Sequence, residues 1–199
     1  KQVVLPKDWE PITTVLWIES EPDGATVYLD GNKVGTTPYQ NIDISVGTHH
    51  IFIEHGELYF PFEWTGKITK EGWKRKVILE PNFGELTIES QPTGANCKLS
   101  GIDIGSTPIK ISKQKAGRYT LECFLPNYFP KRQAVEIAPK EMKKVMMVLE
   151  QNFGSISVSS DPPGASIYLD GRRLGKTTNY TIPVVSPGLH TVKLELEGY

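Results

Sequence analysis

Aromatic side chains between residues 59 and 73 have the types and spacing that best suit a binding site in this sequence. Flat aromatic rings stack on sugars, so Tyr59, Trp64 and Trp73 are candidates for binding a glycan or cell-wall polysaccharide. The alternative, which we favour, is that these rings pack in a core or between domains. The sequence alone leaves both interpretations open.

The two cysteines, Cys97 and Cys123, are the next candidates. Elsewhere the chain fills the matching places with aliphatic residues, so both cysteines suit buried core positions. We favour two free thiols. A disulfide between neighbouring strands is the alternative, which an oxidising compartment would permit. Two cysteines are too few for a framework of disulfides to hold the fold.

Other motifs imitate sites without meeting their chemical requirements. Gly171–Thr177 reads GRRLGKT, with three residues between its glycines where a phosphate-binding loop has four. Asp30 lacks the alternating carboxylates that accompany it in a calcium loop. His49 and His190 match Tyr119 in position, which favours a bond back to the turn backbone over metal binding. The sequence therefore predicts no catalytic residues, no metal and no cofactor, and we expect a protein that is not an enzyme.

One stretch occurs three times, and it organises the whole chain. SEPDGATVYLDG at 20–31 returns as SQPTGANCKLSG at 90–101 and SDPPGASIYLDG at 160–171, 70 residues apart each time. Thr37-Pro38 and Thr107-Pro108 follow in the first two copies, and we align them with Thr177-Thr178 in the third. A fixed period indicates one structural unit per copy.

Each copy predicts strands separated by a corner and a tight turn. Apolar and polar residues alternate before and after a Pro-x-Gly-Ala corner, as in half-buried strands. The second strand ends at an Asp-Gly or Ser-Gly turn, a strong hairpin signal. We assign a structural role to the corner and turn residues, which are Pro22, Gly24 and Gly31, Pro92, Gly94 and Gly101, and Pro162, Gly164 and Gly171.

The expected fold is all-β, a tandem array of small antiparallel β-sandwiches of the immunoglobulin-like or prealbumin-like kind. We expect a lead-in strand at 1–15, repeats at 16–83 and 84–153, and a partial third repeat at 154–199. Short joints, EPNFG at 80–84 and EQNFG at 150–154, predict stiff connections in which Phe83 and Phe153 pack between neighbours. The third copy stops about two strands early, which fits either an excerpt of a longer array or head-to-tail completion by Lys1–Leu5 of another molecule.

Charge and hydropathy exclude some classes of partner. The 199 residues carry 22 basic and 23 acidic side chains, a net charge of −1, which argues against a nucleic-acid partner. No apolar run in the sequence approaches the length that spans a membrane.

The ordered motifs resemble the PEGA domain, a family named for its Pro-Glu-Gly-Ala corner. The likeness covers about residues 17–199 and comprises Ser-x-Pro-x-Gly-Ala, VYLDG, x-x-x-Gly-x-Thr-Pro, Gly-x-His and a closing Gly-Tyr. The second corner residue is Asp23, Thr93 or Pro163 here, never Glu. The resemblance implies a β-sandwich module of envelope proteins, without catalytic residues.

The combined expectation is a non-catalytic structural or interaction protein of the cell envelope. We expect a semi-rigid rod outside the cytoplasm, in the periplasm or at the cell surface, that spaces or scaffolds envelope proteins or contacts cell-wall polysaccharide. A glycan-binding module and the extracytoplasmic part of a signalling protein are the alternatives.

Overall fold

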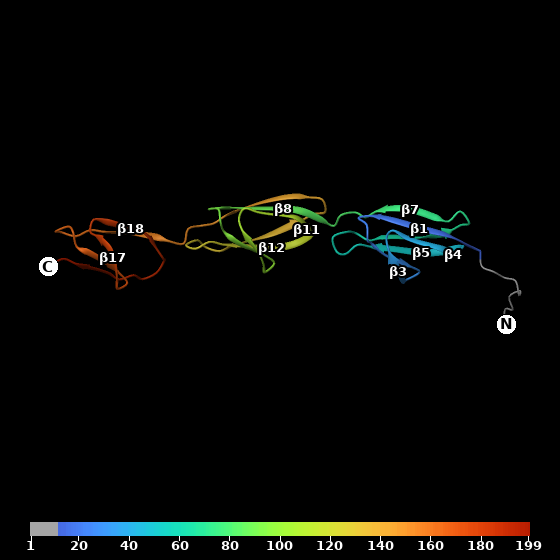
Figure 1. The fold of residues 1–199 in the computed structure, drawn as a ribbon. Helices are drawn as coiled ribbons and strands as arrows, with labels where there is room; N and C mark the ends of the chain where they lie inside the picture. The colour runs from blue at the N-terminus through green and yellow to red at the C-terminus, as the bar shows by residue number, and fades with distance from the viewer. Residues whose placement is uncertain (1–11) are drawn as a thin grey trace, which may run out of the picture. The chain divides into compact units, whose positions relative to one another are not determined.

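A computed structural model describes residues 12–199, and every regular element in it is a strand (Figure 1). The expected all-β fold is confirmed. The strand expected at Lys1–Leu5 lies outside the described residues. The chain divides into two compact units. The first extends to Thr87 and takes in Lys110–Arg118 and Glu136–Lys144; the second holds Ile88–Ile109, Tyr119–Val135 and Val145–Tyr199.

The first repeat consists of two small sheets. One has the order β4-β1-β7 and the other the order β3-β2-β5-β6, and Figure 1 shows β1 and β7 on the side opposite β3 and β5. The bounds are β1 Thr13–Glu21, β2 Thr26–Leu29, β3 Asn32–Thr36, β4 Tyr39–Ser45, β5 Gly47–Glu54, β6 Phe62–Ile68 and β7 Trp73–Ile78.

One pairing in this repeat departs from the antiparallel expectation. β1 pairs antiparallel with β4 but parallel with β7, from Leu16 opposite Trp73 to Glu21 opposite Ile78. A parallel pair needs a connection that crosses over, and here the chain crosses from the edge of one sheet to the edge of the other between β6 and β7. Alternation of apolar residues reports which face of a strand is buried and carries no signal for the direction of its partner.

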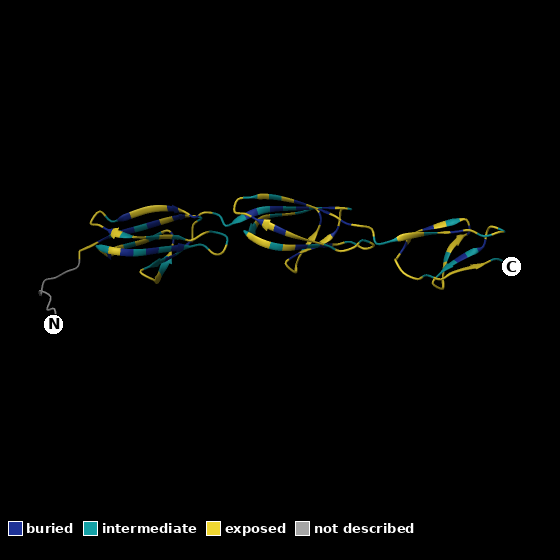
Figure 2. Ribbon diagram, turned by 180° about the vertical axis from the view of Figure 1, so that it is seen from behind, coloured by how far each residue is buried: buried dark blue, intermediate teal, exposed yellow. Residues whose placement is uncertain are grey.

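The core of the first repeat lies between its sheets. β1 buries Leu16 and Ile18, and the facing sheet buries Val27, Ile51 and Ile53, all at 0% exposure. Figure 2 shows the resulting alternation of buried and exposed positions along the strands. Further members of this core are Ala25, Ile44, Ile68, Trp73, Val77 and Leu79.

The second repeat has the same strand order, β11-β8-β14 in one sheet and β10-β9-β12-β13 in the other. The bounds are β8 Phe83–Gln91, β9 Asn96–Leu99, β10 Ile102–Ser106, β11 Ile109–Lys115, β12 Gly117–Phe124, β13 Lys131–Ile137 and β14 Met142–Val148. Its inward positions repeat those of the first copy and include Leu86, Ile88, Leu121, Ile137 and Met147.

The third repeat contains a two-stranded sheet, β15-β18, and a three-stranded sheet, β17-β16-β19. The bounds are β15 Gly154–Val158, β16 Ser166–Leu169, β17 Arg172–Thr177, β18 Tyr180–Val185 and β19 Val192–Glu195. Its smaller core is Val158, Ile167, Ile182 and Val185. Within the described residues this repeat has no counterparts of β6 and β7.

Candidate functional site

The repeated stretch folds into a buried polar corner, built by Ser20 and Thr37 in the first copy. The two hydroxyl oxygens lie 2.5 Å apart, and the Ser20 hydroxyl donates to the carbonyl of Pro22 at 2.6 Å. The Thr37 hydroxyl in turn accepts from the amide of Ala25 at 3.0 Å. Both side chains are buried, so these bonds satisfy groups that water cannot reach. We call such a serine and threonine the corner pair.

The corner pair recurs in both later copies. Ser90 and Thr107 lie 2.5 Å apart, and Ser160 and Thr178 lie 2.6 Å apart. The third copy corrects our alignment, which matched Thr177-Thr178 with Thr37-Pro38. Thr178 takes the place of Thr37 because its hydroxyl accepts from the amide of Ala165 at 3.1 Å, so Asn179 stands where the other copies have proline.

The corner and turn glycines occupy backbone conformations that favour glycine. In the corners Gly24, Gly94 and Gly164 have φ of 81°, 87° and 101°. In the hairpin turns, φ is also positive at Gly31, Gly101 and Gly171 and at the residue before each of them. Two successive positive φ angles are typical of a type I′ turn, whose twist matches that of the flanking strands. The peptide bonds before Pro22, Pro92 and Pro162 are cis.

A histidine and the turn aspartate meet in the first and third copies. His49 Nδ1 lies 2.7 Å from Asp30 Oδ2, and its Nε2 lies 2.9 Å from the carbonyl oxygen of Ser45. His190 makes the same two contacts, with Asp170 at 2.8 Å and Ser186 at 2.7 Å. The predicted bond back to the turn backbone is confirmed for both histidines. The aspartate partner was missed, although Asp30 and Asp170 accompany histidine and Ser100 accompanies Tyr119.

The three aromatic glycan candidates pack against other parts of the protein. Trp73 is buried at 9% exposure and belongs to the core, with the half-buried ring of Trp64 centred 5.2 Å away. Arg75 lies over the Trp73 ring, 5.3 Å from its centre. Tyr59 contacts Phe83 edge-to-face at 5.7 Å. These contacts agree with the packing interpretation and leave Trp73 no free face for a sugar.

Cys97 and Cys123 are joined by a disulfide between β9 and β12. The two residues are directly opposite each other in the antiparallel pair, and both are fully buried. Val27 faces Ile53 at the matching place in the first repeat, and Ile167 faces Leu194 in the third. Of the two interpretations of the cysteines, the structure has the disulfide and not the free thiols that we favoured.

The imitated phosphate motif forms a strand, because Arg172–Thr177 are the residues of β17. An extended strand cannot curl its amides around a phosphate. Across residues 12–199, no group of three or more His, Cys, Asp or Glu side chains is placed to hold a metal ion. No helix in the same residues is long and apolar enough to cross a membrane.

Comparisons with known proteins give a family and distant structural likenesses. The sequence profile of the PEGA domain matches residues 13–81, 83–152 and 153–199. No curated protein matches. The TIE protein of Bacillus anthracis is similar at 16% identity and a TM-score of 0.38, over 96% of this chain and 46% of that one, so the chain spans less than half its length.

Two pilins are also similar in structure. The streptococcal ancillary pilin has 12% identity and a TM-score of 0.31, over 91% of this chain and 83% of that one. BcpA, the major pilin subunit of Bacillus cereus, has 12% identity and a TM-score of 0.28, over 94% and 83%. The profile matches carry the assignment: the chain belongs to the PEGA domain family and contains three tandem matches to it.

Proposed function

We propose that this protein is a non-catalytic structural module outside the cytoplasm, whose PEGA repeats form a semi-rigid spacer for partners in the cell envelope. The observation that carries the proposal is the joint between the first two repeats. There the backbone of each repeat bonds directly to the short connecting segment, so the connection is an extension of the sheets and not a free tether.

Backbone hydrogen bonds hold this joint from both sides. Asn82 donates its amide to Leu58 of the first repeat at 2.8 Å, and its carbonyl accepts from the amide of Ala116 of the second at 2.9 Å. The carbonyl of Phe83 accepts from the amide of Lys140 at 2.7 Å. Backbone groups bonded on both sides of a joint restrict rotation about it, because each rotation would break a bond.

Side chains reinforce the same joint. The ring of Phe83 contacts Tyr59, and the Lys113 ammonium lies 5.5 Å from the centre of the Phe83 ring. Further ion pairs join Lys115 to Glu57 at 2.6 Å and Lys140 to Glu80. Exposed ion pairs contribute about 0–1 kcal/mol each, so the backbone bonds and the aromatic contact restrict the joint more than the charges do.

The joint between the second and third repeats uses the same devices. Tyr128 contacts Phe153 edge-to-face at 6.0 Å, and Asn152 donates its amide to Asn127 at 2.8 Å. Each joint phenylalanine thus packs against the repeat that precedes it. The buried disulfide supports the extracytoplasmic part of the proposal, since disulfides persist in oxidising compartments.

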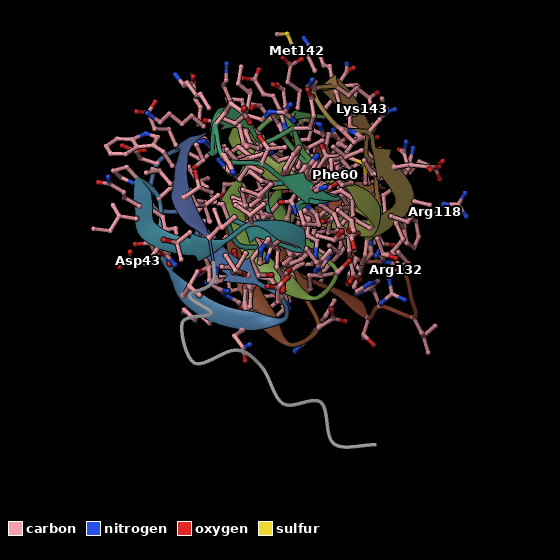
Figure 3. The ribbon with its side chains drawn as sticks, turned by 90° about the vertical axis from the view of Figure 1, so that its right-hand side faces the viewer. Asp43, Phe60, Arg118, Arg132, Met142 and Lys143 are labelled. Carbon is pink, nitrogen blue, oxygen red and sulfur yellow. A yellow bond between two sulfur atoms is a disulfide. The ribbon has the colours of Figure 1, made fainter. Side chains whose placement is uncertain are left out.

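Distance measurement between two spin labels tests the spacer. Labels at Asp43→Cys in the first repeat and Met142→Cys in the second would be specific, because both native cysteines are bonded; Figure 3 shows the two sites at the surface. We expect one narrow distance distribution. The control variant carries a Gly-Ser insertion between Asn82 and Phe83, which should broaden it. Equal widths for the two proteins would contradict the proposed stiffness.

A further inference from the structure

The outer face of the second repeat carries a hollow of about 320 Å³ over β9 and β12. Its lining residues are Asn96, Lys98, Glu122, Phe124 and Pro130. The alternation of the two strands puts the disulfide on the inner face and these side chains on the outer face. A volume of this size is enough for one sugar ring with its substituents.

The first and third repeats close the same place with a tyrosine and a glutamate. Tyr28 donates its hydroxyl to Glu54 at 2.8 Å, diagonally across β2 and β5. Tyr168 is hydrogen-bonded to Glu195 across β16 and β19 in the same way. The tyrosine and glutamate of each pair are therefore hydrogen-bonded to each other across the outer face of the two strands.

The second repeat exchanges both partners of that diagonal. By strand register, Lys98 takes the place of Tyr28 and Phe124 takes the place of Glu54. Phe124 is 52% exposed, and the side chain of Lys98 makes no hydrogen bond or ion pair among residues 12–199. The exchange thus replaces a closed polar pair by an open aromatic ring and an unpaired ammonium group.

Two carboxylates lie beside Lys98 in the strand register, Glu122 on β12 and Asp103 on β10. Glu122 lies directly opposite Lys98 in the register, but its carboxylate bonds to Arg132 of β13 at 2.9 Å. Figure 3 shows Arg132 at the surface of the sheet. Asp103 lies opposite Lys98 on β10, and its carboxylate accepts from the backbone amide of Gly105 at 2.8 Å and from the side-chain amide of Asn96 at 3.5 Å. The two carboxylates therefore balance the charges of Lys98 and Arg132, and both are bonded to groups other than the Lys98 ammonium.

We propose that this hollow binds an acidic glycan, through a sugar ring that carries a carboxylate. The electron-rich face of Phe124 would meet the C–H groups of the ring, as aromatic faces attract positive edges. The Lys98 ammonium would pair with the carboxylate, a charge-assisted hydrogen bond. The Asn96 amide can donate to and accept from hydroxyl groups. This inference concerns a binding activity and is independent of the proposed spacer.

Titration followed by NMR tests the site on the full chain. The probe is an oligomer of galacturonic acid, and the control ligand is its methyl ester, which keeps the ring and masks the carboxylate. We expect saturable shifts of amide signals in β9 and β12 at about 0.15 M salt with the acid, a condition that screens long-range attraction. We expect the ester to bind about tenfold or more weakly, as loss of one charged hydrogen bond implies. Equal binding of the ester would overturn the proposal.

Variants locate the site and separate it from general attraction of charge. Lys98→Tyr with Phe124→Glu rebuilds the closed diagonal of the other repeats and should abolish the shifts while the melting curve shows a folded protein. Lys98→Met alone should weaken binding about tenfold. Lys33→Ala removes an exposed lysine of the first repeat and should change nothing. Three outcomes would each refute the proposed site. They are retained binding by the double variant, a loss of binding in Lys33→Ala equal to that in Lys98→Met, and tighter binding of a polyglutamate peptide than of the acidic sugar.

Discussion

His49 lies between two hydrogen-bond acceptors, with the Asp30 carboxylate 2.7 Å from Nδ1 and the Ser45 carbonyl 2.9 Å from Nε2. A neutral imidazole has one N–H and could donate to only one of them, whereas an imidazolium donates to both. Burial lowers the pKa of His49, but the bonds to Asp30 and Ser45 outweigh it, and the net pKa is raised. The third repeat holds the pKa of His190 above its usual value by the same means, chiefly through Asp170.

The stability of the first and third repeats should therefore depend on pH. A histidine whose pKa is raised on folding stabilises the fold below its unfolded pKa of about 6.5, and the stabilisation disappears as pH rises through the folded value. The bond from His190 lowers the pKa of Asp170, so the stabilisation from this carboxylate is present above about pH 4 and disappears as pH falls. We expect maximal stability between about pH 4 and 6.5 and a decline as the pH rises above that window. Hydrogen exchange of the backbone amides in β2 and β16, followed as a function of pH, measures the stability of the first and third repeats.

The second repeat supplies the control for this pH effect. Its Ser100 and Tyr119 stand at the matching places, and Ser100 accepts from the amide of Thr120 at 3.3 Å. The double variant Asp30→Ser with His49→Tyr should remove the decline from the first repeat while the third keeps it. An equal decline in amides of β9 in the wild-type protein would show that the cause is elsewhere.

Replacing the threonine of a corner pair should destabilise its repeat. In Thr107→Val the amide of Ala95 loses its acceptor in a buried place, while Gly94 keeps the carbonyl of Thr107 at 3.2 Å. One buried donor without a partner costs about 2 kcal/mol, which chemical denaturation would measure. Thr107→Ser keeps the hydroxyl and loses one methyl group, so it should cost about 1 kcal/mol. If the two variants had equal free energies of unfolding, Thr107 would stabilise its repeat through packing and not through hydrogen bonding.

Gly84 should not tolerate alanine, although its backbone is extended. A Cβ there would lie 2.6 Å from the carbonyl oxygen of Glu141 and 2.9 Å from that of Ala138. Such overpacking typically costs about 1–3 kcal/mol, because the segment after β13 must move away. Gly154 stands at the same place in the third repeat, with nothing within 4 Å of a Cβ. We expect Gly154→Ala to leave the unfolding midpoint unchanged or raised, and equal losses at both glycines would contradict the steric explanation.

Removing the disulfide should weaken the second repeat without changing its fold. The bond closes a loop between residues 26 apart in sequence, which in the chain-entropy account stabilises by about 3 kcal/mol. Cys97→Val with Cys123→Ile copies the aliphatic pair of the first repeat, so packing should be kept and only the cross-link lost. Hydrogen exchange of the β9 amides, used as the probe of denaturation, measures the difference in stability between the wild-type protein and this double variant. No change in stability would mean that the aliphatic pair fully replaces the bond.

Several features of the fold could be predicted because each depends on neighbours in sequence. Alternation placed Leu16, Ile18 and Ile53 on inward faces, and the Asp-Gly pair at Asp30 marked a hairpin. The period of 70 residues predicted one unit per copy. The sequence also contained an indication of the bond between Asp30 and His49 that we did not use. In the second copy both partners are replaced together, Asp30 by Ser100 and His49 by Tyr119.

The sequence by itself determined which face of each alternating strand is buried, where the chain turns and that the unit repeats, since backbone sterics and apolar patterning act over a few residues. Only the tertiary structure decided that β7 joins β1 in parallel, that Thr178 completes the third corner pair, that Cys97 and Cys123 are bonded and that Trp73 is buried. Each of these depends on which distant segments meet. That choice is set by the summed packing of the whole repeat, which no local pattern encodes.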